Sequence, residues 1–336
     1  MIIVTNCLGN TADEGGMKVC SSLARRIKAA NPAVTVVSSG SEAGACDVHC
    51  PAGKFLLSWK LVKLLLARKE PVLYLPGYAR TLPTAMRIFL LSLFARWGLR
   101  VLIVMRGPIN RLSAMLLRLS GAEILTLSDE SREAFAAVIG RRASQVKTGV
   151  DTTRFIPVTP EEKHTLRHQY GLPQDKPIVL HVGHMKEGRN IRQLLKVDER
   201  FHVVLVVSTL TAEFEDQALR CALQQKENLT IIDSYIPHIE EIYQAADVYL
   251  FPVEKPRHCI DVPLSALEAA SCGLPVVSTP YGEMKQLLGC SGFCQLDDFD
   301  ARNINDVLDT AIRCGEHGRE HVLPYDWQHA VTELVQ

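Results

Sequence analysis

The sequence contains Val248-Tyr-Leu-Phe251, then a long loop, and then Pro263-Leu-Ser-Ala-Leu-Glu-Ala-Ala-Ser-Cys-Gly-Leu-Pro-Val-Val-Ser278, and this stretch decides the fold. Its pattern predicts a buried strand, a loop, a short helix that begins near Leu264, and a second strand. Gly273 is expected to end the helix, because glycine readily adopts the left-handed conformation found at helix ends. The first N–H groups of a helix have no intrahelical acceptor, so a helix that follows a parallel strand predicts an anion site. Glu268 lies one turn further on, where its carboxylate can reach a hydroxyl group of the same ligand.

Apolar, strand-like segments recur along the whole chain at intervals that leave room for helices. They are residues 2–5, 34–38, 72–75, 101–105, 123–127 and 145–147 in the first half, and 178–182, 203–207, 230–233, 248–251 and 276–278 in the second. This rhythm predicts an α/β fold of two doubly wound, Rossmann-like domains that face a cleft. The turn-rich segment 148–157 predicts a domain boundary, which gives an N-terminal domain over 1–156 and a C-terminal domain over 157–324.

The formal net charge is zero, but the two halves of the chain differ in sign. Residues 1–155 hold 21 Lys and Arg against 10 Asp and Glu, whereas residues 156–336 hold 16 against 27. Three basic segments, 54–69, 86–97 and 111–118, are also rich in apolar residues, but none has the ~20-residue apolar run of a membrane span. Two interpretations stay open: their apolar faces pack on the sheet, or the first two lie on an anionic membrane surface.

The ten cysteines show no paired CxxC spacing, and no stretch is typical of a signal peptide. These features indicate reduced thiols and a cytoplasmic protein. If the basic helices bind lipid, we expect a peripheral location at the inner face of the cell membrane. We expect no nucleic acid among the partners.

A second stretch with chemical character is His181-Val-Gly-His-Met-Lys-Glu-Gly-Arg-Asn190. Its strand is expected to end at Gly183, and the following loop carries His184, Lys186 and Arg189. A helix is expected to begin near the end of the stretch, with its asparagine as the N-cap. Cations beside a helix N-terminus suit a diphosphate, because that group needs both charge neutralisation and amide donors.

In the first half, Gly15 and Gly16 precede a helix predicted over residues 17–29, whose apolar face includes Leu23 and Ile27. The glycines would let a ligand approach the backbone where the helix begins, and a tight turn is the more ordinary explanation. The spacing is not GxGxxG, so the dinucleotide-binding fingerprint is absent.

Six segments, in family order, give the chain a resemblance to the retaining GT-B glycosyltransferases of the "group 1" family. The family's strand-then-serine segment, hinge signature and diphosphate loop resemble residues 127–132, 148–157 and 181–190, respectively. Its tyrosine-to-proline segment, glutamate helix and last-helix start resemble residues 236–252, 264–279 and 325–328, respectively. The resemblance implies a GT-B fold in which helix 325–336 crosses back to the first domain. It also implies a hexosyltransferase-type enzyme that uses a nucleotide-diphosphate sugar in glycan or polysaccharide biosynthesis.

The resemblance further implies roles for particular residues. Glu268 would bind the ribose hydroxyls of the nucleotide, and the amides of Leu264 and Ser265 would face its diphosphate. Either Lys186 or Arg189 would supply the cation that stabilises the leaving phosphate, and these two residues and Glu268 are the catalytic candidates. The other donor-binding candidates are Gly15, Gly16, Gly183, His184, Ile236 and Asp261. The candidates for contacts with the sugar or the acceptor are Arg106 and His258.

Three positions depart from the family pattern. Ile260 stands where the first glutamate of E-x7-E is expected, with Asp261 or Glu254 as substitutes, and His184 replaces the common arginine. Arg106-Gly107 stands at about the place of the histidine that often follows a middle strand of the family's first domain. The alternative to an enzyme is therefore a catalytically degenerate GT-B protein that binds a nucleotide or acts as a scaffold. An epimerase or phosphorylase on the same two-domain plan is a third hypothesis.

Glycosyl transfer must stabilise a diphosphate leaving group and an oxocarbenium-like centre. In the family this is done by cations and a helix N-terminus, so we expect neither a metal nor a cofactor, with the nucleotide sugar as co-substrate. The segment Asp298-Phe-Asp300 resembles a DxD metal site, but it precedes a helix expected at Ala301 and therefore predicts an N-cap. The acceptor is expected to be a glycan or a lipid-linked molecule.

Overall fold

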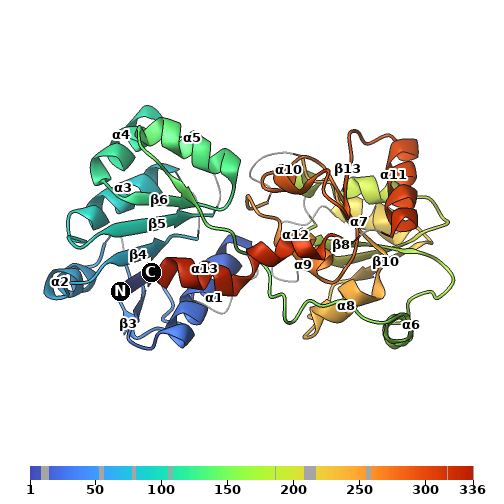
Figure 1. Cartoon of the computed structure of the whole chain (residues 1–336), viewed down its shortest axis with the longest axis horizontal. Helices are drawn as coiled ribbons and strands as arrows, with labels where there is room; N and C mark the ends of the chain where they lie inside the picture. The colour runs from blue at the N-terminus through green and yellow to red at the C-terminus, as the bar shows by residue number, and fades with distance from the viewer. Residues whose placement is uncertain are drawn as a thin grey trace. The chain divides into compact units, whose positions relative to one another are not determined.

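The computed structural model describes residues 1–8, 15–52, 57–77, 81–104, 107, 109–185, 187–207, 217–254, 259–315 and 317–335. The chain divides into two compact units, each built on one parallel sheet (Figure 1). The first unit contains Met1–Thr148, Ile260–Val262 and Trp327–Gln336, and the second contains Gly149–Cys259 and Pro263–Asp326.

The segment after Thr148 belongs to the second unit. Val150 pairs with Asp326 in an isolated parallel bridge. The Asp326 carboxylate also accepts hydrogen bonds from the backbone N–H and the hydroxyl of Thr152, at 2.9 and 2.6 Å. The boundary therefore lies earlier than the predicted residue 156, because the turn after Thr148 is bonded to the segment that precedes the last helix.

The first unit contains a seven-stranded sheet in the order β3-β2-β1-β4-β5-β6-β7, with every pairing parallel. Its strands are β1 (Ile2–Thr5), β2 (Thr35–Ser38), β3 (Val48–His49), β4 (Val72–Leu75), β5 (Leu99–Ile103), β6 (Glu123–Thr126) and β7 (Ser144–Gln145). The sequence pattern missed β3, because two residues are too few to show a period.

The helices of the first unit are α1 (Gly15–Ala30), α2 (Trp59–Ala67), α3 (Thr81–Ser92), α4 (Arg111–Ser120), α5 (Asp129–Ile139) and α13 (Trp327–Val335). Helices α2 to α5 bury one side each in a single core with the sheet, through residues such as Leu61, Ile88 and Leu117. The packing interpretation of the basic helices is therefore confirmed for these faces.

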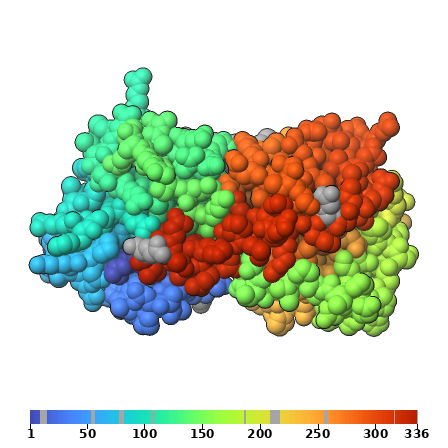
Figure 2. Space-filling view, viewed as in Figure 1, coloured from blue at the N-terminus to red at the C-terminus, as the bar shows by residue number. Residues whose placement is uncertain are grey.

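The last helix packs against the first one. Helix α13, red in Figures 1 and 2, lies beside α1 at the blue start of the chain. The Arg26 guanidinium lies 5.9 Å from the centre of the Trp327 ring, and Arg100 donates to the Leu334 carbonyl at 3.2 Å. The predicted apolar face of α1 is confirmed, since Leu23 and Ile27 are buried.

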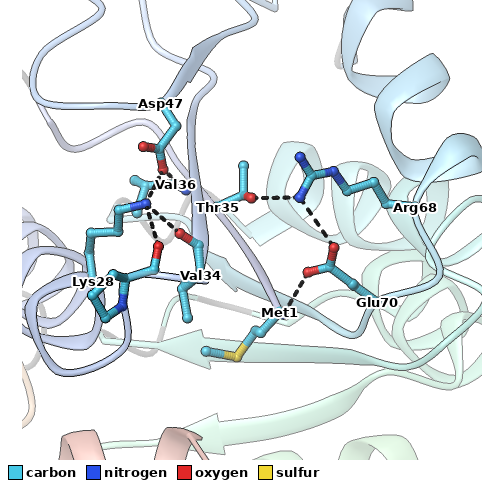
Figure 3. A network of polar contacts seen from close by, with 9 residues as sticks. Met1, Lys28, Val34, Thr35, Val36, Asp47, Arg68 and Glu70 are labelled. Atoms are coloured by element: carbon cyan, nitrogen blue, oxygen red, sulfur yellow. Dashed lines mark hydrogen bonds and ion pairs between the residues drawn. The ribbon is translucent and has the colours of Figure 1, made fainter.

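Two carboxylates organise the polar contacts around strands β1 and β2 (Figure 3). Asp47 accepts a hydrogen bond from Lys28 at 2.9 Å. Glu70 accepts from the amino terminus of Met1 at 2.7 Å and from Arg68 at 3.2 Å. The pKa of Glu70 is lowered below its ordinary value, mainly by the hydrogen bond from the amino terminus. Burial opposes this effect, and the hydrogen bond and charge of Arg68 add smaller contributions to it.

The second unit contains a six-stranded parallel sheet in the order β10-β9-β8-β11-β12-β13. Its strands are β8 (Ile178–Gly183), β9 (His202–Val207), β10 (Leu229–Ile232), β11 (Val248–Phe251), β12 (Val276–Ser278) and β13 (Phe293–Gln295). Its α-helices are α6 (Pro160–Gln169), α7 (Gln217–Gln224), α8 (Ile239–Ala245), α9 (Leu264–Ser271), α10 (Met284–Leu287), α11 (Ala301–Cys314) and α12 (Arg319–Val322). The described residues of this unit also form the 3-10 helices η1 (Glu187–Arg189), η2 (Ile191–Lys196) and η4 (Leu323–Tyr325).

The deciding stretch folds as predicted. Strand β11 leads through a loop to α9, which begins at Leu264, and β12 pairs with β11 in parallel. Gly273 follows the helix with a φ of +82°, the left-handed conformation expected there. Asp300 is the N-cap of α11, because its carboxylate accepts from the N–H of Arg302 at 2.8 Å. Within the described residues, we find no helix of sufficient length and apolarity to span a membrane.

Candidate functional site

Strands β8 and β11 and helix α9 meet at one hydroxyl group in the second unit. Tyr249, on β11, donates to the Ser265 hydroxyl at 2.7 Å, and its oxygen lies 3.2 Å from the Val182 carbonyl of β8. Burial raises the pKa of Tyr249, while these two bonds and the positive charge of Arg189 oppose the rise. The start of α9 is therefore fixed to the carboxyl end of β8, with the Arg189 guanidinium close enough to act on the same phenol.

The N-terminus of α9 has the features of an anion site. Pro263 occupies the N-cap position and makes no side-chain cap bond. Helical geometry leaves the amides of Leu264 and Ser265 without an intrahelical acceptor. The positive end of the helix dipole lies at the same amides, so a negatively charged group is favoured there.

Glu268 lies one turn into α9 and is buried, with 5% of its surface exposed. Its Oε2 accepts a hydrogen bond from the Tyr243 hydroxyl at 2.9 Å. Tyr243 belongs to α8 and has none of its surface exposed. A phenol that donates to one oxygen fixes the plane of the carboxylate, so Glu268 is oriented by the protein.

The loop after β8 differs from the prediction in one respect. Instead of a capped α-helix, the chain forms the short 3-10 helices η1 and η2, separated by Asn190 in a left-handed conformation with a φ of +58°. The Asn190 amide donates to the Pro252 carbonyl at 3.1 Å and accepts from Gln193 at 3.0 Å. Asn190 therefore occupies the predicted N-cap position, where η2 begins, but its side chain is engaged in these bonds and makes no cap bond.

Four aromatic rings form a row through the second unit. His181 and Tyr249 are stacked with ring centres 6.1 Å apart, Tyr249 and Tyr243 lie 6.0 Å apart, and Tyr243 meets Phe155 edge to face at 5.6 Å. The row joins β8, β11, α8 and the segment after Thr148. It also connects the two tyrosines that hold Ser265 and Glu268, so the start and the first turn of α9 share one rigid support.

The sequence did not single out Tyr243, Tyr249 or His181 as site residues. The tyrosines look like ordinary members of apolar segments, and only the three-dimensional contacts reveal their hydroxyl bonds. His181 carried a usable signal, because a histidine inside the apolar run 178–182 needs a polar partner or a role.

The described part of the first unit holds three of the predicted residues. Gly16 is buried, and a Cβ atom placed on it would stand 2.7 Å from the Gly77 carbonyl oxygen. The three atoms nearest to a Cβ on Gly15 all belong to the Ile260 side chain, at 3.3 and 3.5 Å. The glycine at 16 is therefore required by the close approach of two backbone segments, and a bound ligand is not needed to explain it.

Asp261 also belongs to the first unit. Its Oδ2 accepts from the hydroxyl groups of Ser131 and of Ser128, the latter at 3.3 Å. Ser128 is the N-cap of α5, so the carboxylate lies at the positive end of that helix. Asp261 is thus stabilised by contacts within the first unit.

The remaining predicted residues divide into two sets. All of the first set lie in the second unit: Gly183 ends β8, His184 follows it and is buried, and Ile236 lies between β10 and α8. Lys186, Arg106 and His258 lie outside the described residues. Among the residues that the structure describes, no group of three or more His, Cys, Asp and Glu side chains is arranged to hold a metal ion.

Comparison with known proteins gives matches over both units. The sequence pattern of the family described as "Glycosyl transferases group 1" matches residues 176–312. The alpha-maltose-1-phosphate synthase of Mycolicibacterium smegmatis is 23% identical over 62% of this chain and 60% of its own length. The D-inositol 3-phosphate glycosyltransferase of Geodermatophilus obscurus is 30% identical over 58% of this chain and 46% of its own. The chain thus spans about half to three-fifths of the length of these curated relatives.

A solved structure matches the fold along the whole chain. The structure of Anabaena Alr3699/HepE in complex with UDP-glucose superposes with a TM-score of 0.75 and 17% identity, covering 100% of this chain and 98% of the other. The two parallel sheets with their helices therefore define a GT-B fold. Within this fold, residues 176–312 of the second unit match the group 1 glycosyltransferase pattern.

Proposed function

We propose that the protein transfers a sugar from a nucleoside-diphosphate sugar to an acceptor in glycan biosynthesis. The observation that carries the proposal is the Tyr249–Ser265 bond of 2.7 Å, which joins the start of α9 to the carboxyl end of β8. The Arg189 charge acts on the same tyrosine, and Glu268 follows one turn later. A cation, free helix amides and a fixed carboxylate are the groups that a diphosphate and its attached ribose require.

The chemical step needs charge stabilisation on the leaving diphosphate. In the proposed complex, the Leu264 and Ser265 amides and the Arg189 guanidinium take up that charge, and Lys186 is a further candidate cation. Glu268 holds the ribose hydroxyls, which positions the nucleotide without contact to the reacting carbon. We further propose that transfer proceeds with retention of configuration and without a metal. The family match and the names of the relatives favour this enzyme over the scaffold alternative.

We also propose that the acceptor is lipid-linked and that the protein acts at an anionic membrane surface. Helix α4 exposes Leu112, Met115 and Leu119 by 48, 48 and 63%. Their spacing of three and four residues places them on one side of the helix, and Arg111 and Arg118 flank them on the exposed surface. Apolar side chains with flanking cations suit the boundary between headgroups and acyl chains of an anionic bilayer.

A second helix of the first unit exposes apolar and basic side chains of the same kind. Helix α2 exposes Trp59 by 72% and Leu66 by 51%, with Lys63 exposed between them. Both helices belong to the first unit, whose residues carry the excess of positive charge. The exposed apolar and basic groups on α2 and α4 therefore support a peripheral site of action on a membrane.

The test of the enzymatic proposal is release of UDP from UDP-glucose, and of GDP from GDP-mannose, by the purified chain. The Glu268→Gln variant is expected to lose at least tenfold in kcat/KM for the productive donor. Glu241→Gln is the matched control, because Glu241 also accepts a bond from a tyrosine, Tyr170, at 2.6 Å but lies on α8. Equal rates in wild type and Glu268→Gln would refute the assigned role. Absence of binding of either nucleotide by calorimetry would refute the enzyme and favour the scaffold.

A further inference from the structure

A three-residue segment just before α9 belongs to the first unit. This segment, Ile260–Val262, is flanked on both sides by residues of the second unit, Cys259 and Pro263. We call it the strap, and its two apolar residues are buried. Only Pro263, the N-cap of α9, separates the strap from that helix. Because the ring of a proline fixes its φ, the backbone between the strap and the helix has little freedom.

One carboxylate fixes the strap in the first unit. Asp261 Oδ2 accepts a hydrogen bond from the hydroxyl of Ser128 at 3.3 Å and another from the hydroxyl of Ser131. Bonds accepted by an ionised carboxylate are stronger than those between neutral groups. Ser128 is also the N-cap of α5, where the helix dipole favours a negative charge. The backbone N–H of Asp261 donates to the Val104 carbonyl at 3.4 Å, so the strap is held through both side chain and backbone.

The residue before the strap is fixed separately in the second unit. The Tyr281 hydroxyl accepts from the backbone N–H of Cys259 at 3.2 Å and donates to its carbonyl at 2.5 Å. One phenol thus holds both polar groups of the Cys259 backbone. Because that side is fixed, any freedom that the strap gains on losing the Asp261 contact is expected to reach Pro263.

The first turn of α9 depends on the position of Pro263. The N–H groups of Ala266 and Leu267 both donate to the Pro263 carbonyl, at 3.1 and 3.2 Å. These bonds close the turn that carries the amides of Leu264 and Ser265, the proposed ligands of the diphosphate. Pro263 makes no side-chain cap bond, so the turn lacks the support that a capping side chain usually gives. The strap is therefore the part of the chain that supports this turn from its N-terminal side.

We propose that Asp261 is a positioning residue for the donor substrate. By binding Ser128 and Ser131 it fixes the strap, and it thereby holds the first turn of α9 in the geometry that binds the diphosphate. This inference rests on the proposed glycosyltransferase function. It gives the Asp261 carboxylate a role through a contact within the protein, in place of a direct contact with the substrate.

The test removes the contact from the α5 side in the full chain, because Ser131 lies 130 positions from Asp261. Ser131→Ala is expected to speed amide hydrogen exchange at Ala266 and Leu267 at least fivefold in the absence of nucleotide. It is also expected to raise the dissociation constant of UDP or GDP, whichever binds, at least fivefold. Ser120→Ala is the matched control, since Ser120 is a buried serine of the same unit whose hydroxyl donates to a carbonyl at 2.8 Å. The control should leave both quantities within twofold of wild type.

A double variant separates positioning from general destabilisation. Asp261→Ala should have at least the effect of Ser131→Ala, and adding Ser131→Ala to it should change nucleotide affinity by less than twofold, because both substitutions break one contact. Additive losses of affinity would overturn the inference. Unchanged exchange or unchanged affinity in Ser131→Ala would overturn it too, and would leave the proposed function standing. If the wild-type chain binds neither nucleotide, the proposed function falls and the role of Asp261 falls with it.

Discussion

The Tyr243 hydroxyl donates to Glu268 Oε2 over 2.9 Å, and both side chains are buried. Glu268 comes from α9 and Tyr243 from α8, so the bond joins two helices of the second unit. A buried carboxylate is costly unless it is hydrogen-bonded, and the phenol supplies part of that compensation. The same bond fixes the orientation in which Glu268 would meet a ribose.

Tyr243→Phe is therefore expected to weaken nucleotide binding as well as stability. Loss of a hydrogen bond to a charged group costs about 1.5–3 kcal/mol, so unfolding in urea should show a loss of about that size. The dissociation constant of UDP or GDP, whichever binds, should rise about tenfold, because the carboxylate is no longer held in place.

The control for this variant is Tyr325→Phe, which removes a bond from Tyr325 to the buried Glu283 in the same unit. It is expected to lower stability by a similar amount and to leave nucleotide affinity within twofold of wild type. If the two variants changed affinity equally, the effect would be one of stability alone, and the orienting role of Tyr243 would be wrong.

The contrast between Glu268 and Tyr243 shows what the sequence could predict. Glu268 was predicted because it lies one turn into a helix whose ends are marked by Pro263 and Gly273. Tyr243 was not, because it is 25 positions away in the chain and its partner is defined only by tertiary packing. Asn190 shows another limit: it occupies the N-cap position of η2, but its side chain bonds the Pro252 carbonyl and makes no cap bond.

Gly16→Ala is expected to destabilise the first unit. The new methyl group would lie 2.7 Å from the Gly77 carbonyl oxygen and 3.1 Å from Val104, and a backbone oxygen cannot move aside. We expect a loss of about 1–3 kcal/mol, measured from the midpoint of urea unfolding. Gly15→Ala is the matched control, since the nearest atoms to its methyl group belong to the flexible Ile260 side chain, and it should change stability by less than about 1 kcal/mol. Equal losses would show that the Gly77 contact is not what requires glycine at position 16.

Gly15 and Gly16 also show why the sequence alone could not give the reason for a glycine. Two adjacent glycines before a helix are compatible with a ligand, a turn or a close backbone contact, and their spacing does not separate these cases. The backbone contact is identified as the reason only by the position of Gly77, which is 61 residues from Gly16 in the chain. By contrast, the alternation of strands and helices depends on local periodicity, and it was predicted correctly apart from short elements such as β3.

Exchange of the exposed apolar residues of α4 should reduce binding to anionic vesicles. The triple variant Leu112→Gln, Met115→Gln and Leu119→Gln keeps good helix formers at exposed positions. Partial burial of three such side chains contributes about 1.4–2.8 kcal/mol, so the affinity for phosphatidylglycerol vesicles should fall about 10- to 100-fold.

The salt dependence of the same assay checks the contribution of charge. Binding of the wild type should weaken as ionic strength rises, because the basic groups around α4 are exposed and screened. Leu323→Gln, at an exposed leucine of the second unit, is expected to bind as the wild type does. Failure of the wild type to bind such vesicles at low salt would refute the membrane site, whatever the variants did.

His181 should make the second unit sensitive to mild acid. Its folded-state pKa of about 4 lies below the ordinary value of about 6.5, so between these values the unfolded chain binds a proton that the folded chain does not. Stability contributed by the neutral ring is therefore present above about pH 6.5 and is lost as the pH falls to about 4, by roughly 3 kcal/mol in all. Urea unfolding at several pH values across this window should show a smaller acid-dependent loss in His181→Phe than in wild type. Gly183→Ala retains the ring and should follow the wild-type slope, and parallel curves for all three proteins would show that His181 does not titrate as its buried position requires.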